Sequence, residues 1–321
     1  MPEKFAPARW RPEPASTGPA TPLAVDVVHP VDGAGAEDVL VRPDGHVVTG
    51  VADGRIFAVN PDNGSFTLVA DTGGRPLGIE QHPDGGLVVC DATRGLLYVS
   101  PEGDVRTLYD EDLTFTNNAA IAADGTIYFS DSTRRFTVDS WRGDVIEHQR
   151  TGRLLRRTPD GQVDVVADNL AFANGVALAP DGSFVVVAQT SDYDLQRITL
   201  TGADQGARTR FGGALPGFPD NIATGEDGNV WVAIAAPRVP ALDFLGPRHP
   251  AWRKLVWALP DRLKPKEKRV IHVRALSPDG TIVHDRVGEH PDFSNPTGVR
   301  QAGPHVWLGS LFHPAIARFT L

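Results

Sequence analysis

The feature that most restricts the fold is one kind of turn, which recurs between short runs of β-branched and aromatic residues. Each turn contains Asp-Gly, usually after Pro, as in RPDGHVVTG (42–50), HPDGGLVVC (82–90), AADGTIYFS (122–130), APDGSFVVV (179–187) and GEDGNVWVA (225–233). In such turns Asp accepts hydrogen bonds from nearby backbone N–H groups, and Gly adopts a positive φ. A second set, NPDNG, SPEGD, TPDGQ and SPDGT, closes later hairpins. Two turns per unit predict a four-stranded antiparallel meander.

The units repeat along the chain. The Asp residues of the first turns lie at positions 44, 84, 124, 181 and 227, and a sixth unit at 296–321 has the same strand pattern without Asp-Gly. Four strands per unit at this spacing predict an all-β fold, a six-bladed β-propeller. Leu23–His29 is a strand outside every unit, and the last unit ends in a third strand, Ala315–Leu321. We expect these two to pair, so that the N-terminal strand closes the last blade.

The amino-acid composition excludes several classes of binding partner and site. The 31 Lys and Arg residues against 40 Asp and Glu give a net charge of −9, which argues against nucleic acid. A single cysteine, Cys90, excludes an intrachain disulfide and a multi-Cys zinc site. No run approaches 18 apolar residues, so we expect no membrane span. With neither an export signal nor disulfides, we expect a cytoplasmic protein with a small-molecule substrate; the oligomeric state stays open.

The regular spacing of the units indicates a single domain, with an N-terminal arm and two insertions. Residues 1–22 form a Pro-rich N-terminal arm, either a poorly ordered tail or a strap along the domain, and residues 23–321 form a single propeller. Insertions at about 133–152 and 236–268 lengthen the third and fifth units. Within the second insertion, Trp252, Leu255, Val256 and Leu259 have helical spacing between Pro250 and Pro260, which predicts a short amphipathic helix. It either decorates the rim or forms a lid over the tunnel.

The innermost strand of each blade lines the tunnel of a propeller. The residue seven positions before each turn Asp is polar in most units, and the six equivalent positions are Glu37, Leu77, Asn117, Asn174, Asp220 and, aligned without a turn Asp, Thr297. Two carboxylates and two amide carbonyls match the hard oxygen ligands that Ca²⁺ prefers. The absence of His at all six positions argues against Zn²⁺. The alternative is a water-filled tunnel lined by solvated polar groups.

Residues beside these positions are candidates for substrate contact. Asn118 and Asn221 directly follow two of the proposed ligands, and in a strand they should point away from the tunnel. A splayed strand end would instead let either residue touch the substrate or an ordered water. The tunnel positions Leu77 and Thr297, and the nearby Phe115, complete the predicted substrate-binding set.

Several segments resemble the strictosidine synthase / gluconolactonase / regucalcin family. They are GAEDVLV around Glu37, GRPLGIEQHPDG (74–85), NNAAIAADGTIYFSD (117–131), NLAFANGVALAPDGSFVVVAQ (169–189) and LPGFPDNIATGEDGNVWVA (215–233). The match is most similar to the strictosidine-synthase-like branch, which includes the adipocyte plasma membrane-associated proteins. The resemblance implies a six-bladed propeller with a catalytic divalent metal, usually Ca²⁺. It implies Glu37, Asn117, Asn174 and Asp220 as the metal ligands.

Two departures from the family pattern narrow the expected chemistry. Strictosidine synthases use a Glu for their condensation where this chain has Gln189, and a neutral amide cannot act as an acid or base. Alkaloid synthesis is therefore disfavoured. Gluconolactonases of the family place an Arg where Phe115 stands, which weakens the case for a sugar lactone.

The leading hypothesis is a Ca²⁺-dependent hydrolase of a lactone or ester, with the metal polarising the carbonyl. Another divalent cation would serve the same chemistry. Asp220 is the expected base or nucleophile because it is the carboxylate on the open side, whereas Glu37 is expected to be a structural ligand. The alternative is a non-catalytic propeller that binds Ca²⁺ or a partner protein.

Overall fold

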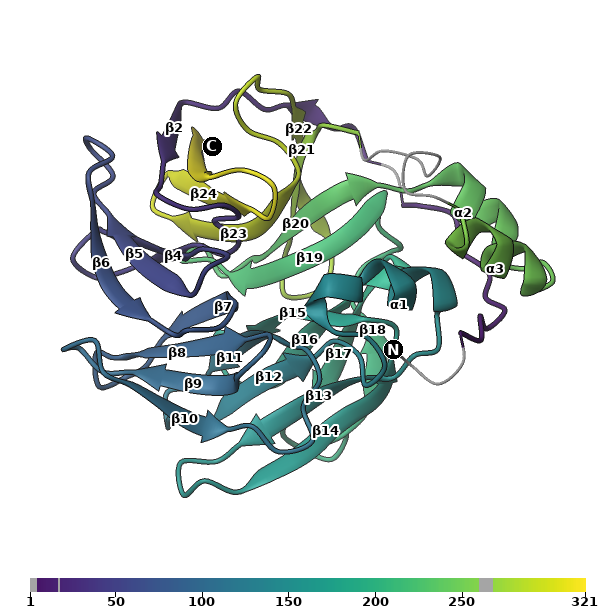
Figure 1. The fold of residues 1–321 in the computed structure, drawn as a ribbon, viewed down its shortest axis with the longest axis horizontal. Coiled ribbons are helices and arrows are strands. Elements are labelled where there is room, and N and C mark those ends of the chain that lie inside the picture. Colours follow the sequence, from purple (N-terminus) through teal and green to yellow (C-terminus); the bar gives the residue numbers. More distant parts are fainter. Residues whose placement is uncertain (1–4, 17, 260–267) are drawn as a thin grey trace.

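Six β-sheets surround a central axis in the computed structural model, which describes residues 5–16, 18–259 and 268–321 (Figure 1). Each sheet has four antiparallel strands. They run in chain order from the axis outward in blades 1 to 5, whereas the outermost strand of the sixth sheet comes from the N-terminal segment; one extra strand is described below. The predicted six-bladed β-propeller is therefore confirmed.

The blades follow one another along the chain. Blade 1 contains β3 (Leu40–Val41), β4 (Val47–Gly50), β5 (Arg55–Val59) and β6 (Phe66–Asp71), and blade 2 contains β7 (Pro76–Gln81), β8 (Leu87–Asp91), β9 (Gly95–Val99) and β10 (Val105–Tyr109). Blade 3 contains β11 (Thr116–Ile121), β12 (Ile127–Asp131), β13 (Gly152–Arg157) and β14 (Val163–Leu170), and blade 4 contains β15 (Ala173–Leu178), β16 (Phe184–Gln189), β17 (Asp194–Thr199) and β18 (Arg208–Arg210). Blade 5 contains β19 (Gly217–Thr224), β20 (Val230–Pro237), β21 (Ile271–Leu276) and β22 (Ile282–Gly288), and blade 6 contains β23 (Pro296–Ala302), β24 (His305–Ser310), β25 (Ala315–Thr320) and β2 (Val27–Pro30).

The Asp-Gly turns join the first and second strands of blades 1 to 5. In each of the five turns the Asp carboxylate accepts a hydrogen bond from the backbone N–H two residues later; the donors are His46, Gly86, Thr126, Ser183 and Asn229, at 2.9–3.0 Å. The following glycine has a positive φ in every case, for example 86° at Gly45. These local bonds fix where each hairpin reverses, and hence the position of the residues that reach the tunnel.

The chain ends close the ring as predicted. Strand β2 pairs antiparallel with β25 in a register that places Val27 opposite Arg318 and Pro30 opposite Ala315. Just before β2, the short strand β1 (Thr21–Pro22) pairs in parallel with β22, so blade 5 has a fifth strand that the repeat pattern did not predict. The N-terminal segment thus bridges two neighbouring blades.

The insertions carry the helices. The first contains the 3₁₀ turn η1 (Val138–Ser140) and helix α1 (Arg142–Glu147), and the second contains α2 (Pro240–Leu245) and α3 (Ala251–Trp257). A further 3₁₀ turn, η2 (Thr190–Asp192), follows β16. Figure 1 shows α2 and α3 projecting beyond the ring on the side of the N-terminal arm. Within the described ranges, no helix is long and apolar enough to cross a membrane.

The short helix expected before Pro260 forms as α3, but not all of the apolar residues that suggested it are buried. Trp252 and Leu255 are 56% and 58% exposed, whereas Arg253 is fully buried. The two terminal nitrogens of the buried guanidinium donate to the backbone carbonyls of Ile146, at 2.8 Å, and Ala8, whereas its Nε has no hydrogen-bond partner among the described residues. Hydrogen bonds to α1 and to the arm, rather than the apolar spacing, therefore decide which way α3 faces.

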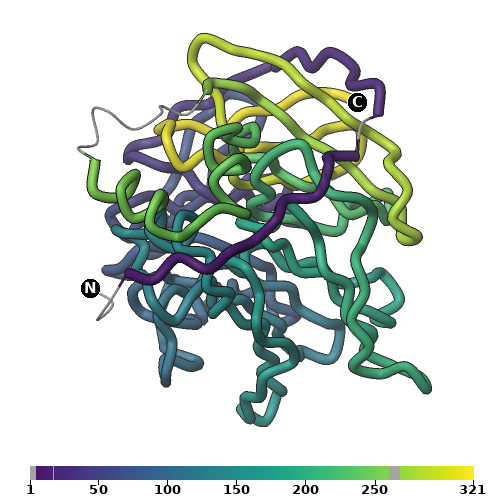
Figure 2. The backbone as a smooth tube through the Cα atoms, turned by 90° about the vertical axis from the view of Figure 1, so that its right-hand side faces the viewer, coloured from purple at the N-terminus to yellow at the C-terminus, as the bar shows by residue number. Residues whose placement is uncertain are grey.

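The described part of the N-terminal arm lies along the helices as a strap (Figure 2). Its backbone bonds to both insertions: Ala8 N–H donates to Glu147 O at 2.8 Å, and Trp10 N–H donates to Gly246 O at 3.2 Å. The Trp10 ring stacks on His148, with centroids 4.3 Å apart and planes 5° apart. The arm therefore holds together two insertions that are distant in the sequence.

Candidate functional site

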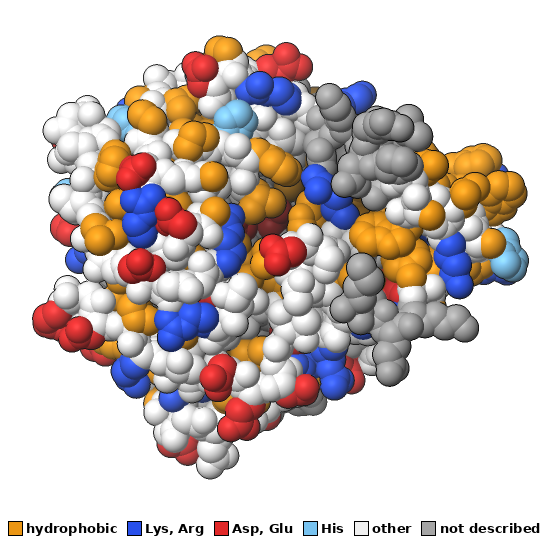
Figure 3. Space-filling view, in the orientation of Figure 1, with side chains coloured by type: hydrophobic (Ala, Val, Ile, Leu, Met, Phe, Trp, Pro, Cys, Tyr) orange, Lys and Arg blue, Asp and Glu red, His pale blue; other side chains and the backbone are white. Residues whose placement is uncertain are grey.

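The six tunnel positions predicted from the repeat all line one cavity of about 410 Å³. They are Glu37, Leu77, Asn117, Asn174, Asp220 and Thr297. Five of them lie in the innermost strands of their blades, and Glu37 lies three residues before β3. The predicted Phe115 also lines this cavity. Figure 3 shows the surface hollowed near the middle of the face that carries the helices. The repeat brings these residues together because the same position of each blade reaches the same level of the tunnel.

The two asparagines have free oxygens. The Oδ1 atoms of Asn117 and Asn174 are buried and have no hydrogen-bond partner among the described residues. The Asn174 amide is oriented by Thr190: its Nδ2 donates to Thr190 Oγ1 at 3.1 Å, and that hydroxyl donates to Pro219 O at 2.7 Å. A buried amide oxygen without a partner is costly. Its presence in this cavity indicates that the site is built to receive a cation or a donor group.

The surroundings of Glu37 and Asp220 raise the pKa values of both carboxyl groups. Glu37 is 3% exposed, and its burial together with the charge of Asp220 raises the pKa of Glu37 well above the ordinary value. Burial likewise raises the pKa of Asp220 to about 7, although a hydrogen bond from Asn174 lowers it. Asp220 is the more accessible of the two, since its side chain is only half-buried. Both shifts come mainly from burial, so two ionised carboxylates are costly at this point of the cavity unless a cation lies beside them.

This donor set fits a hard divalent cation. The cavity supplies two carboxylates, whose charges would neutralise the ion, and two amide oxygens that lack a hydrogen-bond partner within residues 5–16, 18–259 and 268–321. Among the described residues, no three His, Cys, Asp or Glu side chains are grouped so as to hold a metal, so a site here depends on the asparagines. The metal-binding role of Glu37, Asn117, Asn174 and Asp220 stays a prediction.

Asn118 and Asn221, predicted to contact substrate, are not among the residues that line the cavity; each instead bonds to a residue of another blade or of the segment leading into one. Asn118 Oδ1 accepts from Val176 N–H at 2.9 Å, which joins blade 3 to blade 4. Asn221 Nδ2 donates to both oxygens of Glu37, at 3.3 and 3.2 Å. Asn118 therefore holds two blades together, whereas Asn221 orients one of the proposed ligands.

The residues that follow the six tunnel positions alternate around the ring between polar side chains and glycine. In order they are Asp38, Gly78, Asn118, Gly175, Asn221 and Gly298. A Cβ on Gly78 would lie 2.6 Å from Asn118 Cα, and a Cβ on Gly298 would lie 2.7 Å from Asp38 Cα. Asp38 also crosses to the next blade, since its Oδ2 accepts from Ile79 N–H at 3.0 Å. This alternation was visible in the sequence and would have identified Asp38 as a blade-joining residue.

The upper wall of the cavity is mostly apolar. Phe115 meets Phe172 edge to face, with ring centroids 5.5 Å apart, and both pack with Leu77. Both insertions contribute: Val138, Trp141 and Val145 come from the first, and Leu242, Leu245 and Val256 from the second. The helices thus form part of the cavity wall.

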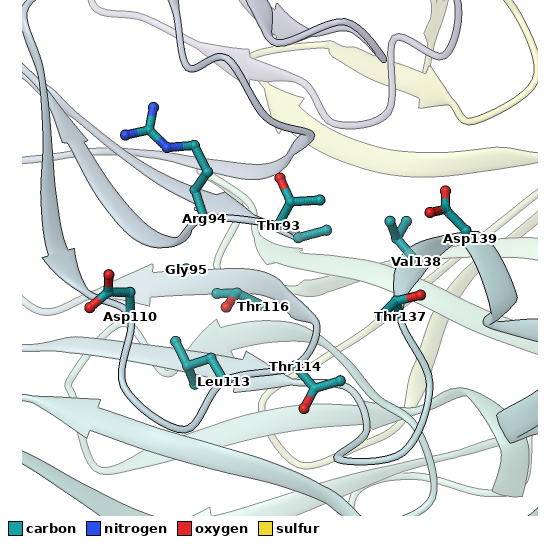
Figure 4. Close-up of a pocket in the computed structure, with 11 residues that line it drawn as sticks. Thr93, Arg94, Gly95, Asp110, Leu113, Thr114, Thr116, Thr137, Val138 and Asp139 are labelled. Atoms are coloured by element: carbon teal, nitrogen blue, oxygen red, sulfur yellow. The ribbon is translucent and has the colours of Figure 1, made fainter. Parts of the chain in front are cut away.

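A second cavity of about 390 Å³ lies to the side of the first. Figure 4 shows its walls, which come from the β8–β9 turn with Thr93 and Arg94, the segment leading into β11, and the residues around Val138. Val138 lines both cavities. None of the predicted site residues lines this second one.

Gln189, which stands where strictosidine synthases carry their catalytic Glu, is buried in the blade. Its Oε1 accepts from Ala171 N–H at 3.0 Å, and its Nε2 donates to Asp194 Oδ1 at 2.8 Å. The side chain is not part of the cavity wall. Its contacts are those of a structural residue.

The sequence matches known proteins over most of its length. The strictosidine synthase family model matches residues 109–202, and the model of the strictosidine synthase-like N-terminal region matches residues 24–59. The chain is 34% identical to the adipocyte plasma membrane-associated protein of Danio rerio, over 85% of this chain and 72% of the relative. The chain belongs to the strictosidine synthase-like family. This family member is also 32% identical to the adipocyte plasma membrane-associated protein of Homo sapiens, over 94% and 81% of the two chains.

Solved structures share the fold of this strictosidine synthase-like chain. A gluconolactonase from Xanthomonas campestris superposes with a TM-score of 0.66 at 17% identity, covering 98% of this chain and all of the other. Regucalcin from Agrobacterium tumefaciens, described as a calcium-binding protein, gives a TM-score of 0.64 at 13% identity over 94% and 95% of the chains. At these identities the likeness shows the propeller fold.

Proposed function

We propose that this protein is a Ca²⁺-dependent hydrolase of a lactone or ester. One observation carries the proposal: Glu37, Asn117, Asn174 and Asp220 reach one cavity from four blades, and the two amide oxygens have no hydrogen-bond partner in the part of the chain that the structure describes. The names of the structural relatives, a gluconolactonase and a calcium-binding regucalcin, support the same class of chemistry.

The four residues have different roles in the proposed reaction. A divalent ion bound there would supply a Lewis acid for the substrate carbonyl. Glu37 is buried and held by Asn221, so it serves as a ligand of fixed orientation. Asp220 faces the cavity and is more accessible, so it takes the proton from the attacking water or attacks the carbonyl itself. Asn117 and Asn174 hold the site and orient the substrate.

The apolar wall shapes what the site accepts. Leu77, Phe115 and Phe172 pack together beside the polar floor, where a sugar would need hydrogen-bonding partners. Phe115 occupies the position where the gluconolactonase pattern has Arg. An ester or lactone with an apolar body fits this wall better than a sugar lactone does.

The test is a panel of lactones and aryl esters, assayed with Ca²⁺ and after treatment with EDTA. Hydrolysis that disappears with EDTA and returns with Ca²⁺ is the expected result. Calorimetry on the same samples separates the alternative, because a non-catalytic propeller would bind Ca²⁺ without turnover. Turnover that is unaffected by EDTA would refute the metal-dependent reaction.

A further inference from the structure

The helices of the second insertion have two different faces. The inner face, with Leu242, Leu245 and Val256, lines the cavity. The outer face carries three large apolar side chains, Phe244, Trp252 and Leu255, which are 58%, 56% and 58% exposed. Trp252 and Leu255 lie three residues apart on α3, and hence on one side of that helix. Figure 3 shows hydrophobic side chains gathered over this projecting part of the molecule.

This concentration of exposed apolar residues is unusual within the chain. Elsewhere among the described residues, Val165 and Val283 lie singly on outer strands of different blades, and Leu68 shares strand β6 with Phe66, which is only 39% exposed. Scattered exposed apolar residues need no explanation, whereas a group on a projecting element marks an interaction surface. The strap and the Arg253 hydrogen bonds hold the helices in place, so the exposed face is a fixed feature of the fold.

The charge around the outer face is opposite to that of the whole protein. Residues 244–259 contain no Asp or Glu, although the chain has 40 acidic residues and a net charge of −9. Arg248, His249 and Lys254 are exposed there. Asp243, which directly precedes this stretch, is half-buried and accepts a hydrogen bond from Tyr193 Oη at 3.0 Å. The outer face therefore combines apolar residues with positive charge.

We propose that this outer face docks on an anionic lipid surface. Aromatic and aliphatic side chains flanked by basic residues are the combination that inserts into the boundary between headgroups and acyl chains. A second copy of this chain is a poor occupant, because a two-fold contact would bring together two faces that both carry Arg248 and Lys254. Docking would bring the helices that wall the cavity against the lipid.

The proposal is independent of the proposed reaction, because its readout is binding alone. Co-sedimentation with vesicles measures it, using phosphatidylcholine alone and phosphatidylcholine mixed with phosphatidylserine. The full chain should bind the mixed vesicles and bind the neutral ones more weakly. F244S/W252S/L255S should lower the partition coefficient at least ~tenfold. R248Q/K254Q should remove the preference for phosphatidylserine, at about fivefold for each charge.

A matched control replaces three apolar residues of similar exposure elsewhere on the surface. Leu68, Val165 and Val283 are 59%, 49% and 47% exposed on outer strands, and L68S/V165S/V283S should bind vesicles as the unchanged protein does. Equal loss in this control and in the helix variant would overturn the proposal. So would a dimer of the unchanged protein that the helix variant alone disrupts, because the occupant would then be a second copy.

Quenching of tryptophan fluorescence by brominated lipid tests the same face without a large change to the fold. The unchanged protein should be quenched on mixed vesicles containing brominated phosphatidylcholine, and W252F should lose most of that quenching. If W252F is quenched as strongly as the unchanged protein, Trp252 does not reach the lipid and the proposal fails.

Discussion

Asn221 donates its Nδ2 to both carboxylate oxygens of Glu37, and so joins blade 5 to blade 1 at the level of the proposed metal ligands. The two residues are 184 positions apart in the sequence. A ligand carboxylate held by a neighbouring amide keeps its orientation, and such supporting contacts are worth about 10- to 100-fold in metal affinity.

Replacing Asn221 should therefore weaken metal binding. We expect Asn221→Ala to lower Ca²⁺ affinity about tenfold, measured by calorimetry, because Glu37 loses the donor that fixes it. The matched control is Asn118→Ala, at the equivalent position of blade 3. Its side chain bonds to Val176 N–H, so this variant should cost about 1–3 kcal/mol of stability and leave the affinity unchanged. Unaltered Ca²⁺ binding by Asn221→Ala would contradict this role.

The two carboxylates should differ in their response to excess metal. Glu37→Gln should weaken Ca²⁺ binding first and turnover as a consequence, so saturating Ca²⁺ should partly restore the rate. Asp220→Asn keeps a carbonyl oxygen but can neither accept a proton nor attack a carbonyl, so it should stay inactive. Steady-state rates across a Ca²⁺ titration distinguish the two. Recovery of Asp220→Asn to nearly the original rate would mean that Asp220 is only a ligand.

The size of the accepted substrate should depend on the helical wall. Leu245 and Val256 line the cavity, so L245A/V256A enlarges it and should favour esters with longer acyl chains by about tenfold in relative kcat/KM. Calcium affinity should not change, because the four proposed ligands lie in other segments. Leu255→Ala is the control, since its side chain faces solvent on the same helix. A lower Ca²⁺ affinity in L245A/V256A with an intact fold would show that the wall also supports the metal site.

Asp144 should make the fold sensitive to pH. It is 1% exposed in α1, and burial raises its pKa to about 7. Between the pKa of an unfolded Asp, about 3.9, and that value, the folded state binds more protons than the unfolded state. Stability should therefore fall as pH rises through this window, by about 1.4 kcal/mol per unit, and stay at its lower value above pH 7.

Asp144→Asn removes the ionisable group and should be more stable than the unchanged protein above pH 7, with the difference shrinking as the pH falls. Denaturant unfolding at a series of pH values measures this. Asp139→Asn, an exposed position in the same insertion, serves as the control. Identical pH profiles for Asp144→Asn and the unchanged protein would show that Asp144 does not carry the effect.

The sequence by itself determined the features that depend on local bonds and on a repeated register. The turn Asp of each blade bonds two residues along its own chain, as Asp44 does to His46, so the hairpins could be placed without knowing their neighbours. Because every blade repeats that turn, one offset from it was enough to identify the six residues that share the cavity.

Only the tertiary structure decided which groups meet across long separations. Nothing near Asn221 in the sequence points to Glu37, and the backbone carbonyls that let Arg253 lie buried belong to the first insertion and the N-terminal arm. The helical spacing of apolar residues predicted where α3 forms. Which side of α3 faces solvent depends on those distant acceptors. Buried polar groups form hydrogen bonds with the groups that the folded chain brings close to them. These partners can be far away in the sequence, so local sequence patterns do not identify them.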